Sequence, residues 1–341
     1  MIVAGARASI DRLINQSIDT GRKGESEEGN GTPVADPGAL ERIAVIAPGG
    51  YDADPARLAN ARHYFEGRGH RLVEAVDAYS RHARFSADDD QRLAQLRRVI
   101  DAPDIDIAIA LRGGYGATRL LPHIAFDAMA SAIEVRGKRF VGHSDFTAIQ
   151  LGLLAKTRAI SFAGPMASYD FGGPAVDPYT EAHFWRAMQE GRVDAEFETP
   201  HDDLNASGVL WGGNLAMIAS LVGTPWMPQV DGGVLFIEDI NEQPYRIERM
   251  LLQLLHAGIL ARQRLVLCGD FSGYKVAPYD NGYDVAAAIA YVRSITSVPI
   301  VTGFPFGHCA KKLTLAVGAA IDVEVRCGQC RVRQRWDLPA R

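Results

Sequence analysis

Short apolar segments alternate with amphipathic segments over residues 43–165, and this alternation constrains the possible folds more than any other feature of the sequence. Residues 43–47 read IAVIA, which predicts a buried strand, and a Pro-Gly-Gly turn ends it. Residues 54–70 have helical spacing, with a proline in the first turn and glycines at the end. The next segments repeat the pattern, with a strand at 71–76, a helix at 86–103 and a strand at 104–116. This order predicts a parallel sheet covered by helices.

The second half of the chain has a different pattern. Residues 167–206 lose the periodicity, and we expect a linker with one helix around 183–189. A second unit begins at residue 207, with apolar strands near 232–239, in RLVLCGDFSG and in VPIVTGFPFGH. The segment YRIERMLLQLLHAG predicts an amphipathic helix that stops at its glycine. We expect residues 313–327 to form a closing pair of strands.

Composition excludes several classes of protein. The chain has 341 residues and a formal net charge of −5, so it has no general attraction for nucleic acid or anionic membranes. No apolar run approaches the roughly 20 residues of a membrane span, and charged residues interrupt the start where a signal peptide would be apolar. We expect a cytoplasmic protein with a flexible N-terminal extension at 1–41. Of the four cysteines only Cys327 and Cys330 have paired spacing, which favours structural thiols over a metal or redox site.

Three polar residues follow apolar strands, where chemistry gathers in open α/β sheets. Ser144 follows RFVGH, Glu238 follows GVLFI and His308 follows VPIVTGFPFG. A histidine that takes the proton of a hydroxyl, together with a carboxylate that orients the histidine, makes a serine nucleophilic at neutral pH. Each residue also has an ordinary interpretation. Ser144 or Asp145 can cap the next helix, Glu238 can be a solvated loop residue, and a loop histidine often has no special task.

The motifs at and near Ser144 do not decide between a catalytic and a structural role for these residues. Gly142-His143-Ser144 is followed by Asp145-Phe146, so the second glycine of the GxSxG elbow of the α/β-hydrolases is missing. A glycine-rich turn at 111–121 contains Gly113 and Gly114, which allow backbone N–H groups to face an oxyanion. This turn does not fit the G-x-G-x-x-G spacing of a phosphate-binding loop.

Seven segments together provide a much more specific signal. They are IAPGGY, RGGYGATRLLPHIAF, GHSDFTAIQLGLLA, FAGPM, GVLWGGNLAMIASLVGTPWMP, IEDINEQPYRIERMLLQLLHAGIL and GFPFGH. In this order the chain resembles the serine LD-carboxypeptidases over roughly residues 43–325. The resemblance implies an N-terminal parallel-sheet α/β domain at 42–166, a linker at 167–206 and a C-terminal domain with β-barrel character and helices at 207–341. It also implies a homodimer.

The resemblance further implies a reaction, which is the removal of the terminal D-alanine from the murein tetrapeptide in peptidoglycan recycling. The bond cut joins the L-centre of meso-diaminopimelate to D-Ala, and neither a metal nor a cofactor takes part. The implied roles are nucleophile Ser144, acid Glu238, base His308, and oxyanion N–H groups of Asp145, Gly113 and Gly114. With Ser144 as nucleophile, Asp145 is left as the helix cap.

The leaving D-Ala carries a carboxylate, which should bind a nearby cation. We expect Arg112 to be that cation, and the alternative is that Arg112 has only a structural role. Two other functions stay open. One is hydrolysis of a peptide-nucleotide antibiotic by a related branch of the family, which confers immunity. The other is a catalytically silent muropeptide-binding module, against which the intact Ser, Glu and His argue.

Overall fold

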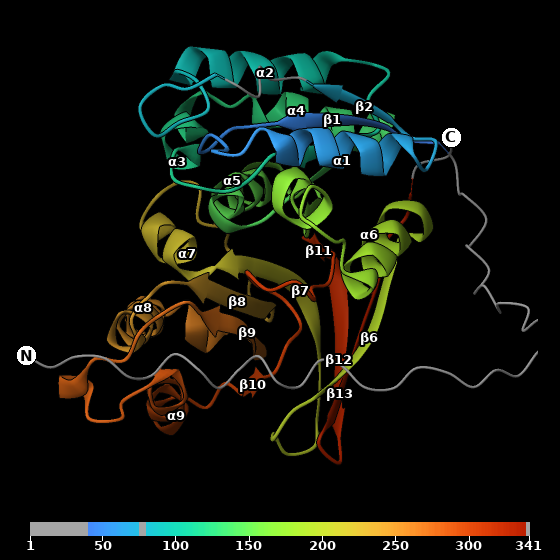
Figure 1. Ribbon diagram of the computed structural model, residues 1–341. Helices are drawn as coiled ribbons and strands as arrows, with labels where there is room; N and C mark the ends of the chain where they lie inside the picture. The colour runs from blue at the N-terminus through green and yellow to red at the C-terminus, as the bar shows by residue number, and fades with distance from the viewer. Residues whose placement is uncertain (1–39, 75–79, 339–341) are drawn as a thin grey trace, which may run out of the picture. The chain divides into compact units, whose positions relative to one another are not determined.

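The computed structural model describes residues 40–74 and 80–338, which belong to one compact unit that contains two sheets (Figure 1). The first sheet has six strands in the order β11-β5-β4-β3-β1-β2. All its neighbours pair in parallel except β11 with β5. Its strands are β1 (Arg42–Ile46), β2 (Arg71–Glu74), β3 (Ile107–Ala110), β4 (Arg139–Gly142), β5 (Ser161–Ala163) and β11 (Leu315–Val317).

Helices cover both faces of this sheet. Successive side chains of a strand point to opposite faces, so each strand contributes to both layers of the core. On β1, Ile43 and Val45 belong to one buried cluster and Ala44 and Ile46 to another. Helices α1 (Ala56–Glu66) and α6 (Pro178–Glu190) contribute to the first cluster. The second cluster takes side chains from α2 (Asp89–Asp101), α3 (Ala117–Leu120), α4 (Phe126–Arg136) and α5 (Thr147–Thr157). The predicted helix-covered parallel sheet is confirmed.

The second sheet has seven strands in the order β10-β9-β8-β7-β12-β13-β6 and is open, with β10 and β6 at its edges. Strands β10 to β7 pair in parallel, and β7 to β6 pair antiparallel. The strands are β6 (Arg192–Glu198), β7 (Leu204–Asn214), β8 (Val234–Ile240), β9 (Leu265–Ser272), β10 (Ile300–Thr302), β12 (Ala320–Arg326) and β13 (Gln329–Arg335). Helices α7 (Leu215–Leu221), α8 (Pro244–His256) and α9 (Val285–Ile295) accompany it.

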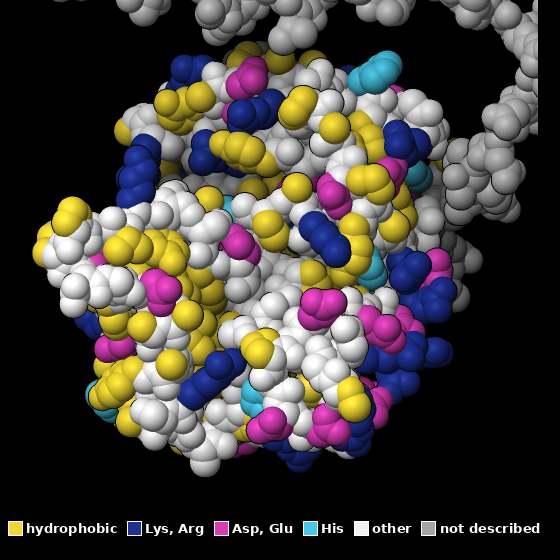
Figure 2. Space-filling view, turned by 60° about the horizontal axis from the view of Figure 1, so that its bottom comes forward, with side chains coloured by type: hydrophobic (Ala, Val, Ile, Leu, Met, Phe, Trp, Pro, Cys, Tyr) yellow, Lys and Arg dark blue, Asp and Glu magenta, His cyan; other side chains and the backbone are white. Residues whose placement is uncertain are grey.

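One hydrophobic core joins the two sheets. Trp211 of β7 and Phe236 of β8 are fully buried in the same cluster as Phe140 of β4. The antiparallel half of the second sheet also carries surface charges of both signs, which gather at the right of the face in Figure 2. Exposed pairs such as Arg331–Asp194, at 2.9 Å, contribute little stability, so the shared apolar core holds the sheets together.

Two segments differ from the sequence-based expectation. The predicted linker at 167–206 contains β6 and the start of β7 besides α6, which covers the helix expected around 183–189. Strand β6 buries Val193 and Ala195, and the residues next to them are more exposed. The alternation that is typical of a strand was therefore present in the sequence, but only over a short segment. The prediction of a closing pair within 313–327 is wrong, because β11 joins the first sheet whereas β12 pairs with β7 and β13. Gly318 lies between these strands with a φ of +100°.

Most of the predicted N-terminal extension lies outside the described residues, but its last two residues, Leu40 and Glu41, do not. Glu41 is fully buried, and its carboxylate pairs with Arg139 at 2.7 Å. Cys327 is exposed and Cys330 buried, and both are free thiols. Within 40–74 and 80–338, no three His, Cys, Asp or Glu side chains gather as metal ligands would. No helix in those ranges is long and apolar enough to cross a membrane.

The pair Arg139–Glu41 gives a test of the core. We expect Arg139→Met to lower the free energy of unfolding by about 3–5 kcal/mol, because it leaves the Glu41 carboxylate buried without its cation. The double variant Arg139→Met/Glu41→Gln removes both charges and should recover part of that loss. Chemical denaturation of the three proteins measures both effects. Equal losses in the single and double variants would contradict this account.

Candidate active site

Ser144 lies at a sharp turn between a buried strand and a helix, as predicted. Strand β4 ends at Gly142, a short 3₁₀ turn covers Ser144–Phe146, and α5 starts at Thr147. Ser144 has a φ of +60°, a left-handed conformation that is strained for a residue with a side chain. The turn also needs Gly142, since a Cβ there would lie 2.8 Å from both Ala110 and Phe146. The backbone thus holds the Ser144 side chain in a fixed, partly exposed position.

The predicted glycine turn lies directly against Ser144. A Cβ on Gly113 would lie 2.7 Å from Ser144 Oγ, so only glycine fits there. The Gly114 N–H donates to Asp145 Oδ2 at 3.1 Å, and the Ser144 hydroxyl donates to the same oxygen at 3.4 Å. Burial raises the pKa of Asp145 against these hydrogen bonds. Asp145 therefore binds the glycine turn and does not cap the helix, and neither the 3₁₀ turn nor α5 has a side-chain cap.

Glu238 lies inside β8, within the strand predicted near 232–239. Strand β8 continues to Ile240, with a register shift against β9 between Ile237 and Asp239. The Glu238 side chain is fully buried, and its Oε2 accepts a hydrogen bond from Nδ1 of His308 at 2.6 Å. Glu238 is therefore bonded to the histidine and is not a solvated loop residue.

His308 lies on the loop between β10 and β11, as predicted, with 14% of its side chain exposed. Burial alone lowers its pKa, but the hydrogen bond and the charge of Glu238 outweigh burial, and the pKa is raised. The His308 ring contacts the ring of His143, with centroids 4.8 Å apart, and its charge acts on Asp145. His308 thus lies beside both neighbours of Ser144. Burial puts the pKa of His143 well below its ordinary value, and its Nδ1 bonds the Gly164 carbonyl at 2.9 Å.

Asn214 joins the strand that carries Glu238 to the helix that follows Ser144, and sequence reasoning missed it. Its backbone N–H donates to Oγ1 of Thr147 at 3.1 Å. Its amide nitrogen donates to Glu238 at 3.3 Å and to Asp239 at 3.0 Å. Burial raises the pKa of Asp239 to about 6, against hydrogen bonds from Ala216 and other donors. The polar Asn at the end of the apolar WGGN segment was the signal that could have revealed it.

Arg112 follows β3 and lies beside the glycine turn. Its guanidinium donates to the Tyr51 carbonyl at 3.0 Å and lies 5.6 Å from the centre of the Tyr169 ring. Its terminal nitrogen is also 3.6 Å from where a Cβ on Gly114 would be. Arg112 is therefore close to the predicted oxyanion site and is held there by Tyr51.

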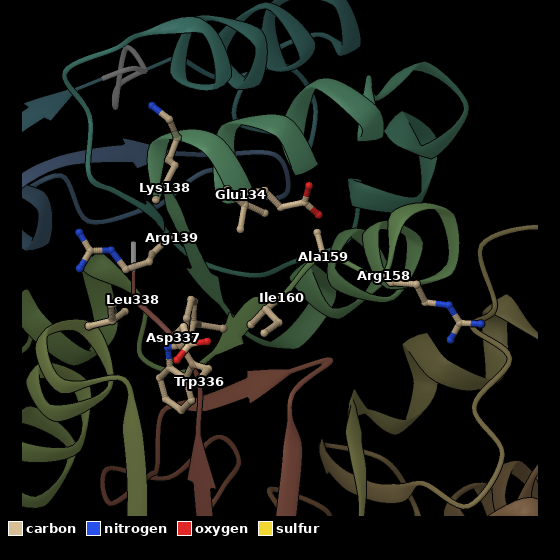
Figure 3. A pocket seen from close by; sticks show the side chains of 12 residues that line it. Glu134, Lys138, Arg139, Arg158, Ala159, Ile160, Trp336, Asp337 and Leu338 are labelled. Carbon is tan, nitrogen blue, oxygen red and sulfur yellow. The ribbon is translucent and has the colours of Figure 1, made fainter. Parts of the chain in front are cut away.

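A cavity of about 350 Å³ lies at the opposite end of the first sheet (Figure 3). Its walls include Ile160, Phe162 and Trp336, and none of the predicted site residues lines it. The charged ends of Lys138 and Arg139 are directed away from it in Figure 3, where they bond the Ala102 carbonyl and Glu41. Glu134, Arg158 and Asp337 also line the cavity, so it has both apolar and charged walls and is separate from the residues around Ser144.

The chain is similar to known proteins over both sheets. Residues 43–164 match the LD-carboxypeptidase N-terminal domain, and residues 207–323 match the LD-carboxypeptidase C-terminal domain. The crystal structure of a muramoyltetrapeptide carboxypeptidase from Oxalobacter formigenes has a TM-score of 0.82 and 44% identity, and the match covers 88% of this chain and 100% of that one.

Two curated relatives also match most of the chain. A probable murein peptide carboxypeptidase of Bacillus subtilis (strain 168) is 31% identical over 283 residues, which is 82% of this chain and 87% of the relative. A microcin C7 self-immunity protein of Escherichia coli is 26% identical over 270 residues, which is 69% of this chain and 75% of the relative. The protein therefore belongs to the LD-carboxypeptidase family.

Proposed function

We propose that the protein is a serine LD-carboxypeptidase that removes the terminal D-alanine from the murein tetrapeptide, with Ser144 as nucleophile, His308 as base and Glu238 as the acid that orients it. The hydrogen bond of 2.6 Å between Glu238 and His308, beside the strained turn at Ser144, carries this proposal. A buried carboxylate on Nδ1 fixes the tautomer in which Nε2 is free to accept a proton.

The reaction follows from these roles. The Ser144 hydroxyl exchanges its long bond to Asp145 for one to His308 and attacks the diaminopimelate carbonyl, while His308 takes the proton. The imidazolium, stabilised by Glu238, then protonates the departing amine of D-Ala as the C–N bond breaks. Water attacks the acyl-enzyme by the same route, with His308 again as base, and releases the shortened peptide.

Two further roles complete the proposal. The N–H groups of Asp145 and Gly113 are the proposed donors to the oxyanion, because a Cβ on Gly113 would lie 2.7 Å from Ser144 Oγ and 3.5 Å from the Asp145 nitrogen. Gly114 was predicted as a third donor, but its N–H is engaged by Asp145. Arg112 binds the carboxylate of the leaving D-Ala with the guanidinium nitrogens that Tyr51 does not occupy.

The murein substrate is favoured over a peptide-nucleotide antibiotic. Identity to the Oxalobacter muramoyltetrapeptide carboxypeptidase is 44%, against 26% to the microcin self-immunity protein. The family resemblance also leads us to propose a cytoplasmic homodimer. Light scattering of the purified protein and cell fractionation test these two properties.

The roles of the three residues predict the effect of mutations. Ser144→Ala and His308→Ala should each lower kcat by roughly a thousandfold or more, and the double variant should lose little further, because the residues act as one unit. Glu238→Gln should reduce kcat less than either, since it disturbs only the orientation of His308. D-Ala release from murein tetrapeptide measures these effects. The exposed residues Ser294 and His256, each changed to Ala, serve as matched controls. Normal turnover in Ser144→Ala would refute the assignment.

The contact of Gly113 with the nucleophile gives a second prediction. Gly113→Ala should abolish D-Ala release, because its Cβ would lie 2.5 Å from Ser144 Cβ and must displace the hydroxyl. Gly223→Ala is the control, since no atom lies within 4 Å of its added Cβ. The control should cost about 1 kcal/mol of stability through its positive φ and leave turnover unchanged. An active Gly113→Ala protein would mean that Ser144 is not the nucleophile.

The substrate assignment predicts selectivity for the peptide terminus. The tetrapeptide ending in D-Ala should be cleaved, and those ending in L-Ala or carrying a further D-Ala should be cleaved at least about a hundredfold more slowly. Inverting the terminal centre displaces its carboxylate, and a misplacement of about 1 Å can cost a hundredfold in rate. The extra residue occupies the carboxylate site and leaves its cation unpaired. Alanine release from the three peptides at equal concentration measures this. Equal rates would exclude the murein substrate even if Ser144 remained essential.

A further inference from the structure

The segment that carries His308 is bonded to the first half of the chain and not only to the second sheet. Residues 303–314 join β10 of the second sheet to β11 of the first. Within this segment the Ala310 carbonyl accepts a hydrogen bond from Thr180 Oγ1 at 2.6 Å. The Lys312 N–H donates to the same hydroxyl at 2.9 Å. Thr180 is in the first turn of α6, so α6 holds the backbone of this segment.

A buried ion pair adds a second attachment. Nζ of Lys312 lies 2.6 Å from Oδ1 of Asp170, and only 4% and 7% of the two side chains are exposed. The other oxygen of Asp170 accepts the Met166 N–H at 2.7 Å, which fixes the carboxylate. Buried ion pairs bring little net stability, because desolvation offsets their attraction. The stability of the fold therefore does not explain why this pair lies beside the site.

The charges that face His308 come from three directions. Glu238 and Asp239 lie on β8, and both favour the charged imidazolium. His143 and Asp145 belong to the Ser144 turn, and His143 is buried and neutral at ordinary pH. Lys312 comes from the segment of His308 itself, with the thiol of Cys309 beside it. The Lys312 ammonium opposes protonation of both His308 and His143.

We propose that Lys312, held in place by Asp170, is a positioning residue for His308: it anchors the segment 303–314 to the first half of the chain and opposes protonation of the imidazole by its own charge. The proposal rests on the function proposed above, since it assumes that His308 must be unprotonated to act as base. Lys312 touches neither the substrate nor the reacting atoms and acts through the histidine alone.

The variant Lys312→Met tests this in the full-length protein, because it keeps the length of the side chain and removes the charge. Loss of a nearby positive charge raises the pKa of His308, so the base loses its proton only at higher pH. The acid limb of kcat/KM for D-Ala release should move to higher pH by about half a unit or more. The plateau kcat should fall about tenfold, because the segment loses one anchor.

Two further variants separate this role from a structural one. Lys312→Met/Asp170→Asn leaves no unpaired buried charge, so it should regain stability while it keeps the displaced acid limb. It also replaces the single variant if that protein does not fold. Arg139→Met breaks an ion pair of similar burial at the other end of β4, roughly 16 Å along the strand from Ser144. It should lower stability and leave the pH profile unchanged.

A titration of the His308 ring by NMR supplies a readout that does not need turnover, with the signal assigned by its loss in His308→Gln. Its midpoint should move to higher pH in both variants of Lys312. Unchanged midpoints and pH profiles in folded variants would overturn the proposal. If the wild-type protein released no D-Ala but the midpoint still moved, the proposed function would fail while the action of Lys312 on His308 stood.

Discussion

The position of His308 relative to Ser144 depends on the crossing of the chain between the two sheets. The segment 303–314 leaves the second sheet at β10 and enters the first at β11, where it pairs antiparallel with β5. Strand β5 is the parallel neighbour of β4, which leads to Ser144. The histidine is therefore held from both sheets. This explains how Glu238 and His308 come within 2.6 Å of each other, next to the turn of Ser144, although the three residues lie far apart in the sequence.

Five polar side chains between the sheets form one connected set. Asn214 bonds Thr147, Glu238 and Asp239, and Glu238 bonds His308. Burying such groups is costly unless each has a partner, so an arrangement that satisfies them all is strongly preferred over a partly satisfied one. The set is thereby rigid before substrate binds, as electrostatic preorganisation requires. An apolar interface between the sheets could give similar stability but could not orient an imidazole.

Sequence periodicity predicted the parallel sheet and the turn at Ser144, because both depend on local pattern and on short strands buried on both faces. It predicted a strand near 232–239 but left open whether Glu238 was a solvated loop residue, because the contacts that bury its carboxylate come from Asn214 and His308, far away in the sequence. It also missed Lys312, whose partner Asp170 is 142 residues away. The resemblance to a family indicated which residues act, whereas the contacts that position them are tertiary and needed the structure.

Three positions that are distant in sequence need glycine for the same physical reason. Gly113 follows β3, Gly142 ends β4 and Gly213 lies near the end of β7, and a Cβ on each would lie within 2.8 Å of Ser144, Phe146 or Thr147. All three contacts are with the first residues of the turn that leads into α5. Left-handed strain at Ser144 costs about 1–3 kcal/mol and persists only where the surroundings permit no other conformation. Close approach of three backbone segments supplies that constraint, and Gly142 serves the sheet as well, because a Cβ there would also lie 2.8 Å from Ala110 of β3.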